Sequence, residues 1–206
     1  VPDVGPLPTT VPIPSSNLNY AAKIDLGKQL YFDRQLSKNN AISCAFCHNP
    51  GTGFADSRQT SIGVGGGIGG RQSPTVYNTA FNHVQFWDGR AATLEDQSIG
   101  PFTNPIEHGF TNHDLMVQKM KRIPGYRKLF MEAFFSDEIT IGNVGKAIAS
   151  FQRTVLSGNS PADKFDQGQD AGAIPAAAQR GLLLFRDKAR CTKCHSGFNF
   201  TDEKFH

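Results

Sequence analysis

The chain has 206 residues, of which 38% are hydrophobic, and its formal net charge at pH 7 is +3. This length fits one or two domains, and so small a charge does not indicate binding to nucleic acid or to an anionic membrane surface. No apolar run approaches the roughly 20 residues of a membrane-spanning helix, and no basic and apolar leader opens the chain.

The first third of the chain predicts one helix, one short helical turn and much loop. Residues 1–19 are rich in proline and predict an extended N-terminal arm. From Tyr20 to Phe32 apolar residues recur at helical spacing and predict a short amphipathic helix. A turn at Asn39 and Asn40 precedes a short helix that begins near Cys44. Residues 49–75 are rich in Gly, Ser and Asn and predict a long loop, which in a compact domain is usually functional or disordered.

Helical patterns return after this loop. Good N-cap residues begin three predicted helices, which run from Thr93 to Ile99, from Asn112 to Ile123 and from Thr140 to Val155. A short helix over 126–135 precedes the last of these, and Pro175 begins a final helix. The break at 157–161 predicts a domain boundary, so we expect domains at 20–157 and 158–206. No segment predicts a strand, and the expected fold class is all-α with long loops.

All four cysteines fall into two CxxCH motifs, formed by Cys44, Cys47 and His48 and by Cys191, Cys194 and His195. This spacing is the signature of c-type haem attachment, in which each thiol adds to a haem vinyl group and the histidine binds the iron. Two such motifs with no cysteine left over make a chance explanation poor. We therefore expect two covalently bound haem c groups. Because such haem is attached outside the cytoplasm, we expect a periplasmic protein whose signal peptide has been removed.

Other uses of the cysteines explain less. The gap between the two CxxC pairs is far longer than the roughly 15–20 residues usual for one zinc site. A thioredoxin-like redox pair follows a strand, and residues 39–43 are a poor strand. Disulfides within each motif would close very short loops and stabilise little. The chain stops at His206, soon after His195, and we expect the second haem domain to be incomplete at this point.

Several short segments between Thr60 and Glu107 indicate a family. They are Thr60-Ser61-Ile62-Gly63, Ser73-Pro74-Thr75-Val76, Asn78, Gln85-Phe86-Trp87-Asp88-Gly89-Arg90 and Gly100-Pro101. With the two haem motifs in the same order, residues 20–200 resemble the bacterial dihaem cytochrome c peroxidases. The resemblance implies two cytochrome c-like domains. The N-terminal haem would be the peroxidatic one, and the C-terminal haem would accept electrons from a small redox protein.

The resemblance also implies roles for individual residues. His48 would be the proximal ligand of the peroxidatic iron, and His195 that of the electron-transfer iron. Gln97 and Glu107 match the distal pair that positions peroxide and moves its protons, which one carboxylate can do by general base and acid steps. Trp87 matches the tryptophan between the two haems, although core packing would also explain a lone tryptophan.

One position departs from the family pattern. In many members the segment after the first haem motif reads Ser-Ile-Gly-His, and that histidine caps the peroxidatic iron until the other haem is reduced. Here Val64 follows Gly63, and valine cannot ligate iron. We therefore expect an open iron in the oxidised protein and no need of reductive activation. The histidines that could replace the missing ligand are His83, His108 and His113.

Two other functions stay open at this point. An open distal site also resembles the dihaem oxidases that mature the tryptophan tryptophylquinone of methylamine dehydrogenase, which modify a protein substrate through haem iron. A tyrosine ligand on the second haem would favour that branch, and a methionine would favour a peroxidase. A non-catalytic electron-transfer cytochrome would need two six-coordinate irons, against which Val64 argues.

The resemblance further implies a calcium ion between the domains, for which Gln72 offers a side-chain carbonyl oxygen. Taken together, the sequence predicts a cytochrome-c peroxidase-type oxidoreductase that reduces hydrogen peroxide to water. Its electrons would come from a small cytochrome c or cupredoxin. We expect no nucleic-acid partner and no membrane span, and a homodimer stays open.

Overall fold

A computed structural model describes residues 5–206, so residues 1–4 of the expected N-terminal arm lie outside the described part. The described residues divide into two compact units, one of residues 12–155 and one of residues 5–11 with 156–206. The regular elements of the described residues are helices, with isolated β-bridges rather than strands, which confirms the expected all-α class. No helix among them is both long and apolar enough to cross a bilayer.

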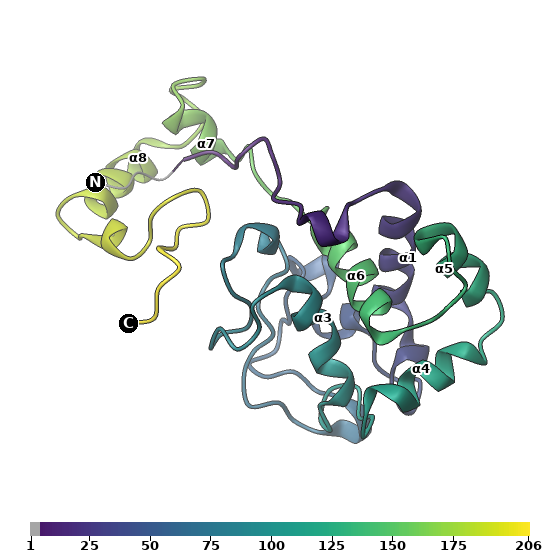
Figure 1. Ribbon diagram of the computed structural model, residues 1–206. Helices are drawn as coiled ribbons and strands as arrows, with labels where there is room; N and C mark the ends of the chain where they lie inside the picture. The colour runs from purple at the N-terminus through teal and green to yellow at the C-terminus, as the bar shows by residue number, and fades with distance from the viewer. Residues whose placement is uncertain (1–4) are drawn as a thin grey trace. The chain divides into compact units, whose positions relative to one another are not determined.

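The larger unit is built from five helices and the short helix of the first CxxCH motif (Figure 1). In chain order they are α1 (Ala21–Phe32), α2 (Cys44–Cys47), α3 (Leu94–Thr103), α4 (His113–Lys121), α5 (Tyr126–Phe134) and α6 (Ile141–Gln152). Helices α1 and α3 both pack against α6. Gly27 allows the close approach of α1, because a Cβ there would lie 1.9 Å from the carbonyl oxygen of Ala147.

Side-chain caps start three of these helices, as the sequence predicts. Thr93, Asn112 and Thr140 each accept a hydrogen bond from the backbone N–H three residues later, which satisfies a donor that the first turn leaves free. All three helices end at a different residue from the predicted one, and α4 ends at Lys121 rather than Ile123. Helix α3 continues beyond Ile99 to Thr103 with Pro101 inside it, and α6 ends at Gln152 rather than Val155.

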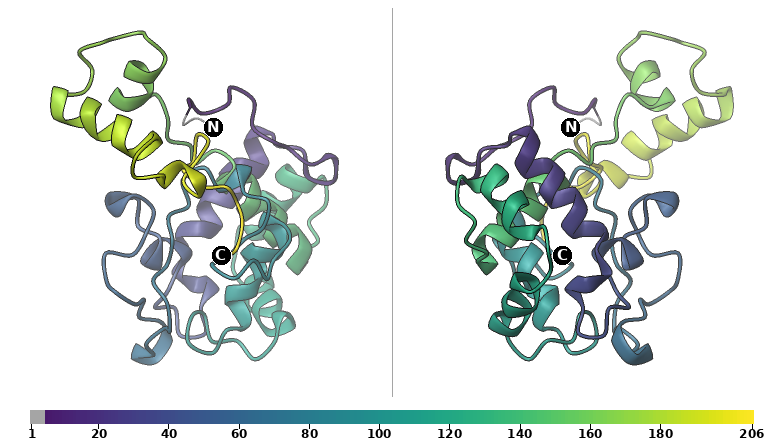
Figure 2. Two further views of the ribbon diagram at one scale, coloured as in Figure 1. Left: turned by 90° about the vertical axis from the view of Figure 1, so that its left-hand side faces the viewer. Right: turned by 90° about the vertical axis from the view of Figure 1, so that its right-hand side faces the viewer.

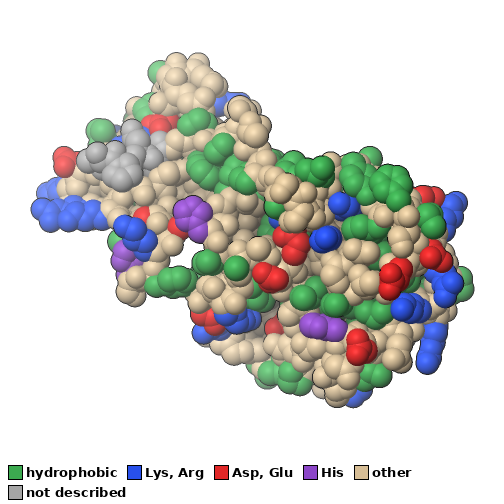
Figure 3. Space-filling view, in the orientation of Figure 1, with side chains coloured by type: hydrophobic (Ala, Val, Ile, Leu, Met, Phe, Trp, Pro, Cys, Tyr) green, Lys and Arg blue, Asp and Glu red, His purple; other side chains and the backbone are tan. Residues whose placement is uncertain are grey.

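The core of the larger unit gathers apolar side chains from every long helix. Its fully buried members include Leu26, Leu30 and Tyr31 of α1, Phe102 of α3, Met116 and Met120 of α4, Phe130 of α5 and Val144 and Ile148 of α6. At the surface over α4 and α5, positive and negative side chains are interspersed (Figure 3). This side therefore presents no field of a single sign, in keeping with the small net charge of the chain.

The smaller unit holds α7 (Pro161–Asp166), α8 (Ala176–Arg186) and the 3₁₀ turn η6 (Cys191–Lys193) of the second CxxCH motif (Figure 2). Helix α8 confirms the helix predicted after Pro175. The sequence prediction missed α7, although Ser160 and Asp163 form a capping box at its start. The buried hydrophobic side chains of the described residues all belong to the larger unit, whereas Leu183 and Leu184 of α8 are 66% and 52% exposed.

Candidate active site

The first CxxCH motif folds into a turn that presents its histidine to a cavity. The short helix α2 places both thiols on successive turns, and the N–H of His48 donates to the carbonyl oxygen of Cys44 at 2.9 Å. The Nδ1–H of His48 donates to the carbonyl oxygen of Pro74 at 2.8 Å. The ring therefore keeps the lone pair on Nε2, which is the arrangement of a histidine that binds a metal.

A cavity of about 300 Å³ lies over this motif within the larger unit. Such a volume is at the lower end of the usual range for cofactor and ligand sites. The residues expected in the site that line it are Cys44, Cys47, His48, Gln72, Trp87, Gln97 and Glu107. The fold thus brings together, in one cavity, haem-attachment residues and a distal pair that lie far apart in the sequence. No disulfide joins cysteines among the described residues, so both pairs are available for thioether bonds.

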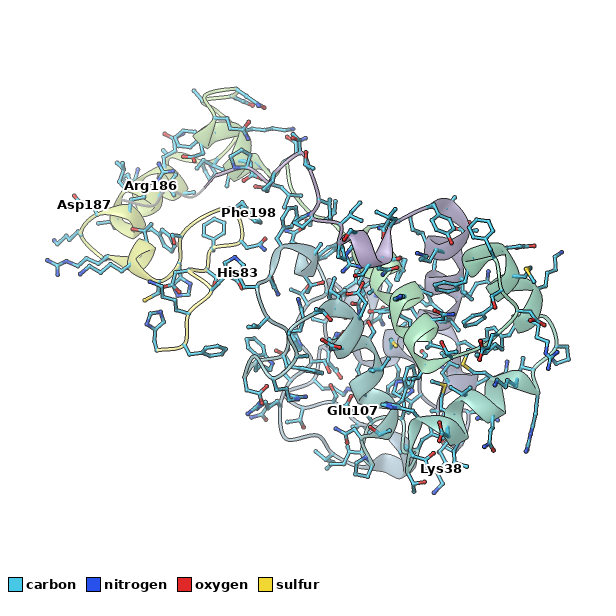
Figure 4. The ribbon with its side chains drawn as sticks, viewed as in Figure 1. Lys38, His83, Glu107, Arg186, Asp187 and Phe198 are labelled. Atoms are coloured by element: carbon cyan, nitrogen blue, oxygen red, sulfur yellow. The ribbon has the colours of Figure 1, made fainter. Side chains whose placement is uncertain are left out.

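Glu107 enters the cavity from the loop after α3, where Figure 4 labels it beside Lys38 in the same part of the larger unit. Asn104 caps α3 and fixes this loop, because its Oδ1 accepts from the N–H of Ile106 at 2.9 Å. Its Nδ2 donates to Oε1 of Glu107 at 2.6 Å. Burial raises the pKa of Glu107, and the charge of Arg90 and the Asn104 hydrogen bond oppose that rise. The carboxyl group can therefore hold or release a proton closer to neutral pH than an exposed glutamate.

Gln97 reaches the same cavity from α3. Its Oε1 accepts a hydrogen bond from Nε2 of Gln152 on α6 at 3.3 Å. Gln152 also lines the cavity and is only 6% exposed. The sequence prediction missed Gln152 and Asn104. A signal for Gln152 existed, because it follows Val144 and Ile148 at intervals of four residues on the buried face of the predicted helix.

Val64 belongs to a segment that lies against the backbone of the Glu107 loop. Its N–H donates to the carbonyl oxygens of Ile106 at 2.9 Å and of Glu107 at 3.2 Å. Its side chain packs over Gly109, where an added Cβ would lie 2.7 Å from Val64 Cγ2. The neighbouring Gly63 lines the cavity, while Val64 does not.

Of the three candidate replacement histidines, His108 alone lines the cavity. It is 3% exposed, and its Nδ1–H donates to the carbonyl oxygen of Leu36 at 2.8 Å. Burial lowers its pKa to about 4 against the effect of that hydrogen bond, so the ring is neutral near pH 7. His83 is exposed, and His113 pairs through Nε2 with the carbonyl oxygen of Ile99 at 3.0 Å.

Trp87 lies at the cavity with 57% of its surface exposed, and its Nε1–H donates to the backbone carbonyl oxygen of Gln72 at 2.9 Å. Core packing, the alternative weighed for Trp87, does not describe so exposed a side chain. The side-chain Nε2 of Gln72 donates to the carbonyl oxygen of Asp56 at 2.9 Å. Among residues 5–206 no group of three or more His, Cys, Asp or Glu side chains is placed to hold a metal ion, and the calcium at Gln72 stays a prediction.

The second motif repeats the geometry of the first in the smaller unit. The N–H of His195 donates to the carbonyl oxygen of Cys191 at 2.8 Å, and its Nδ1–H donates to the carbonyl oxygen of Phe200 at 3.0 Å. Here too Nε2 keeps the lone pair. Phe185 of α8 lies beside the ring, with centroids 6.4 Å apart. In both motifs a backbone carbonyl oxygen holds Nδ1 of the histidine and leaves Nε2 available to bind a metal.

Residues 21–171 match the family described as di-haem cytochrome c peroxidase. The chain belongs to this family. It is 44% identical over 97% of its length to the methylamine utilization protein MauG of Methylorubrum extorquens, of which the match covers 56%. It is 44% identical over 90% of its length to the cytochrome c peroxidase Ccp of Escherichia coli, covering 39% of that protein. The chain thus spans about half the length of such relatives, or less.

Solved structures of the family share the fold. A MauG-like protein associated with microbial copper homeostasis superposes with a TM-score of 0.85 at 32% identity, over 97% of this chain and 60% of that chain. A diheme peroxidase from Burkholderia thailandensis gives a TM-score of 0.77 over 95% of this chain and 58% of that chain. Its 22% identity makes it a likeness of fold alone. The family contains both cytochrome c peroxidases and MauG-type proteins, so the expected resemblance is confirmed.

Proposed function

We propose that the chain forms the peroxidatic part of a dihaem c-type peroxidase that reduces hydrogen peroxide to water. The observation that carries the proposal is the single cavity that joins His48 with Gln97 and Glu107. Family membership supports it, since relatives of this chain are cytochrome c peroxidases. The donor would be a small cytochrome c or cupredoxin that delivers electrons through the haem of the second motif.

The residues at the cavity fit a c-type haem. Cys44 and Cys47 would form the thioether bonds, and His48 Nε2 would bind the iron, because Nδ1 is already engaged by Pro74. Arg71 and Arg90 line the cavity and share the Asp88 carboxylate at 2.7 and 2.8 Å. They offer positive charge for the haem propionates. When bound, the haem supplies the iron at which peroxide is reduced.

Glu107 moves the protons in this proposal. Its oxygen Oε2 would take a proton from one peroxide oxygen and return it to the other, which leaves as water. The remaining oxygen would become a second water with two electrons from the donor and two further protons. The raised pKa of this half-buried carboxyl suits both halves of the transfer. Asn104 holds Oε1 and so keeps the carboxyl in one orientation. Gln97 adds a neutral amide that hydrogen-bonds peroxide without competing for the proton.

The open distal side follows from Val64. We infer that the first haem needs no reductive activation, because Val64 has no ligating atom and its side chain packs on Gly109 away from the cavity. The periplasm remains the expected compartment for a protein with covalent haem. Trp87 as an electron relay, calcium at Gln72 and a homodimer also remain predictions.

A second candidate function is supported by the same residue. Val64 and the 44% identity to a methylamine utilization protein favour an oxidase that modifies a protein substrate. The two functions would differ in the distal ligand of the second haem. In the full-length protein, magnetic circular dichroism of that haem distinguishes the two ligands. A methionine ligand supports the peroxidase, and a tyrosine ligand supports the oxidase.

Replacing Glu107 tests the peroxidase directly. In the full-length haem-loaded protein, Glu107→Gln should lower kcat/KM for hydrogen peroxide roughly 10²–10⁴-fold, the usual contribution of a general acid–base group. The matched control is Glu138→Gln at an exposed glutamate of the same unit, which should keep the wild-type rate. Wild-type turnover by the Glu107→Gln variant would contradict the proposal.

A further inference from the structure

Gln152 is a buried polar residue next to the distal pair. It is the last residue of α6, the helix against which α3 packs, and these helices lie side by side in Figure 1. Only 6% of its surface is exposed. Its side chain lines the cavity together with Gln97.

The hydrogen bond between the two amides is directional. Nε2 of Gln152 donates to Oε1 of Gln97 at 3.3 Å. An amide has one acceptor end and one donor end, so this bond occupies the acceptor end of Gln97. The end of Gln97 that remains for a ligand in the cavity is its NH₂ group, a donor.

The Gln152 side chain lowers the free energy of unfolding at its position. Its Oε1 is buried and has no hydrogen-bond partner among the described residues. A buried polar atom without a partner is unfavourable, and an apolar side chain of the same shape would avoid that cost. Filling space in the core therefore does not explain a glutamine at this position. Its donor, directed at Gln97, does.

We propose that Gln152 is a positioning residue that fixes which end of the Gln97 amide faces the ligand. With Gln152 in place, Gln97 presents its NH₂ group to a peroxide oxygen or an anion on the iron, and Glu107 provides the proton-transfer group. Without Gln152, the Gln97 amide can turn round and present its oxygen, which repels an anion. This inference rests on the proposed function, because it places Gln97 beside the ligand.

Fluoride binding to the oxidised full-length holoprotein tests, without turnover, whether the NH₂ group of Gln97 faces the ligand. Fluoride bound at the iron is stabilised by a nearby hydrogen-bond donor. Removing one hydrogen bond to a charged group weakens binding by roughly 10-fold. We expect Gln97→Leu and Gln152→Leu each to raise the fluoride Kd by about that factor. The double variant should be no worse than Gln97→Leu alone, because both changes remove the same interaction.

Ser150 supplies the matched control. It lies two residues before Gln152 on α6, is fully buried, has an unpartnered Oγ and does not line the cavity. Ser150→Ala should leave the fluoride Kd unchanged. Gln152→Leu should raise or keep the thermal unfolding midpoint and should weaken the binding of fluoride. If leucine disrupts folding, Gln152→Ile offers a second apolar side chain of similar volume that cannot bind the iron.

Two results would overturn the positioning role. One is a wild-type fluoride Kd in both folded Gln152 variants. The other is an effect of Gln152→Leu that simply adds to that of Gln97→Leu. Failure of the proposed function appears separately, as absence of peroxide turnover by the wild-type holoprotein. A wild type that fails this assay but shows the coupled fluoride effects would retain the positioning role and lose the peroxidase.

Discussion

The backbone N–H of Val64 donates a hydrogen bond to the carbonyl oxygen of Glu107 at 3.2 Å. The segment that carries a blocking histidine in many relatives is thereby attached to the loop of the expected catalytic carboxylate. Gly63 makes this contact feasible, since a Cβ there would lie 1.7 Å from the carbonyl oxygen of Ile106. A shift of the backbone at Gly63 and Val64 would therefore also shift the loop that carries Glu107.

Gly63→Ala tests that coupling. The added methyl cannot fit against Ile106 and should lower the free energy of unfolding by about 1–3 kcal/mol, as overpacking usually does. It should also lower kcat for peroxide because the Glu107 loop must shift. Gly142→Ala is the matched control in the first turn of α6, where the new Cβ meets only Thr140 Oγ1 at 4.0 Å. Gly142→Ala should keep or raise the midpoint of chemical denaturation. An unchanged midpoint for Gly63→Ala would contradict the close packing of Gly63 against Ile106.

The pH dependence of turnover should report Glu107. As a proton acceptor it must be ionised, so kcat/KM for peroxide should fall as the pH drops through its raised pKa. The Asn104 hydrogen bond lowers that pKa, and Asn104→Ala should therefore move the acidic limb to higher pH. Steady-state rates across the pH range measure the limb. A limb that stays in place, or moves to lower pH, would show that Asn104 does not act on Glu107.

His108 should not ligate the iron. Its ring is held by the Leu36 carbonyl and packs edge-on against Phe102, with centroids 4.9 Å apart. His108→Leu removes the hydrogen bond without adding an iron ligand and should cost about 1 kcal/mol of stability. The optical spectrum of the oxidised haem should remain that of the wild type. A change of spin state in this variant would identify His108 as the missing distal ligand.

Acid stability should depend on Asp56. Two hydrogen bonds from the Arg58 guanidinium, at 2.8 and 2.7 Å, lower the pKa of this buried carboxyl from 3.8 to about 2. A lowered carboxyl pKa stabilises the folded state above the unfolded pKa, and this stabilisation is lost as the pH falls through the folded pKa. The wild type should thus lose stability between about pH 4 and pH 2.

Asp56→Asn should lack this part of the pH dependence, so its difference in Tm from the wild type should shrink as the pH falls over that range. The control is Asp137→Asn, because Asp137 and its ion-pair partner Arg127, 3.7 Å away, are both exposed. Exposed ion pairs contribute little to stability. A constant Tm difference for Asp56→Asn down to pH 2 would contradict the assignment.

The helices were predictable because their signals are local. Thr93, Asn112 and Thr140 cap helices where the sequence places them, and apolar spacing identified the buried face of α6. Helix ends were less predictable. Pro101 argues for an earlier end of α3, yet burial of Phe102 in the core holds one more turn in helical form.

The site was predictable only in part. The CxxCH motifs name the haem ligands by chemistry alone, whereas Gln97 and Glu107 required the resemblance to a family. The contacts of Gly63 with Ile106 and of Gln152 with Gln97 join segments more than forty residues apart. No periodicity or cap in a single sequence encodes such contacts. The packing of Val64 on Gly109 is of the same kind.

Electron paramagnetic resonance of the fully oxidised full-length protein tests whether the distal side of the first haem is open. The His48 haem should give a high-spin ferric signal, since Val64 would leave its distal side to water or to no ligand. This signal should be present before any reduction of the second haem. A spectrum in which both haems are entirely low-spin, with a bis-histidine signal from the first, would show that another histidine closes the distal side.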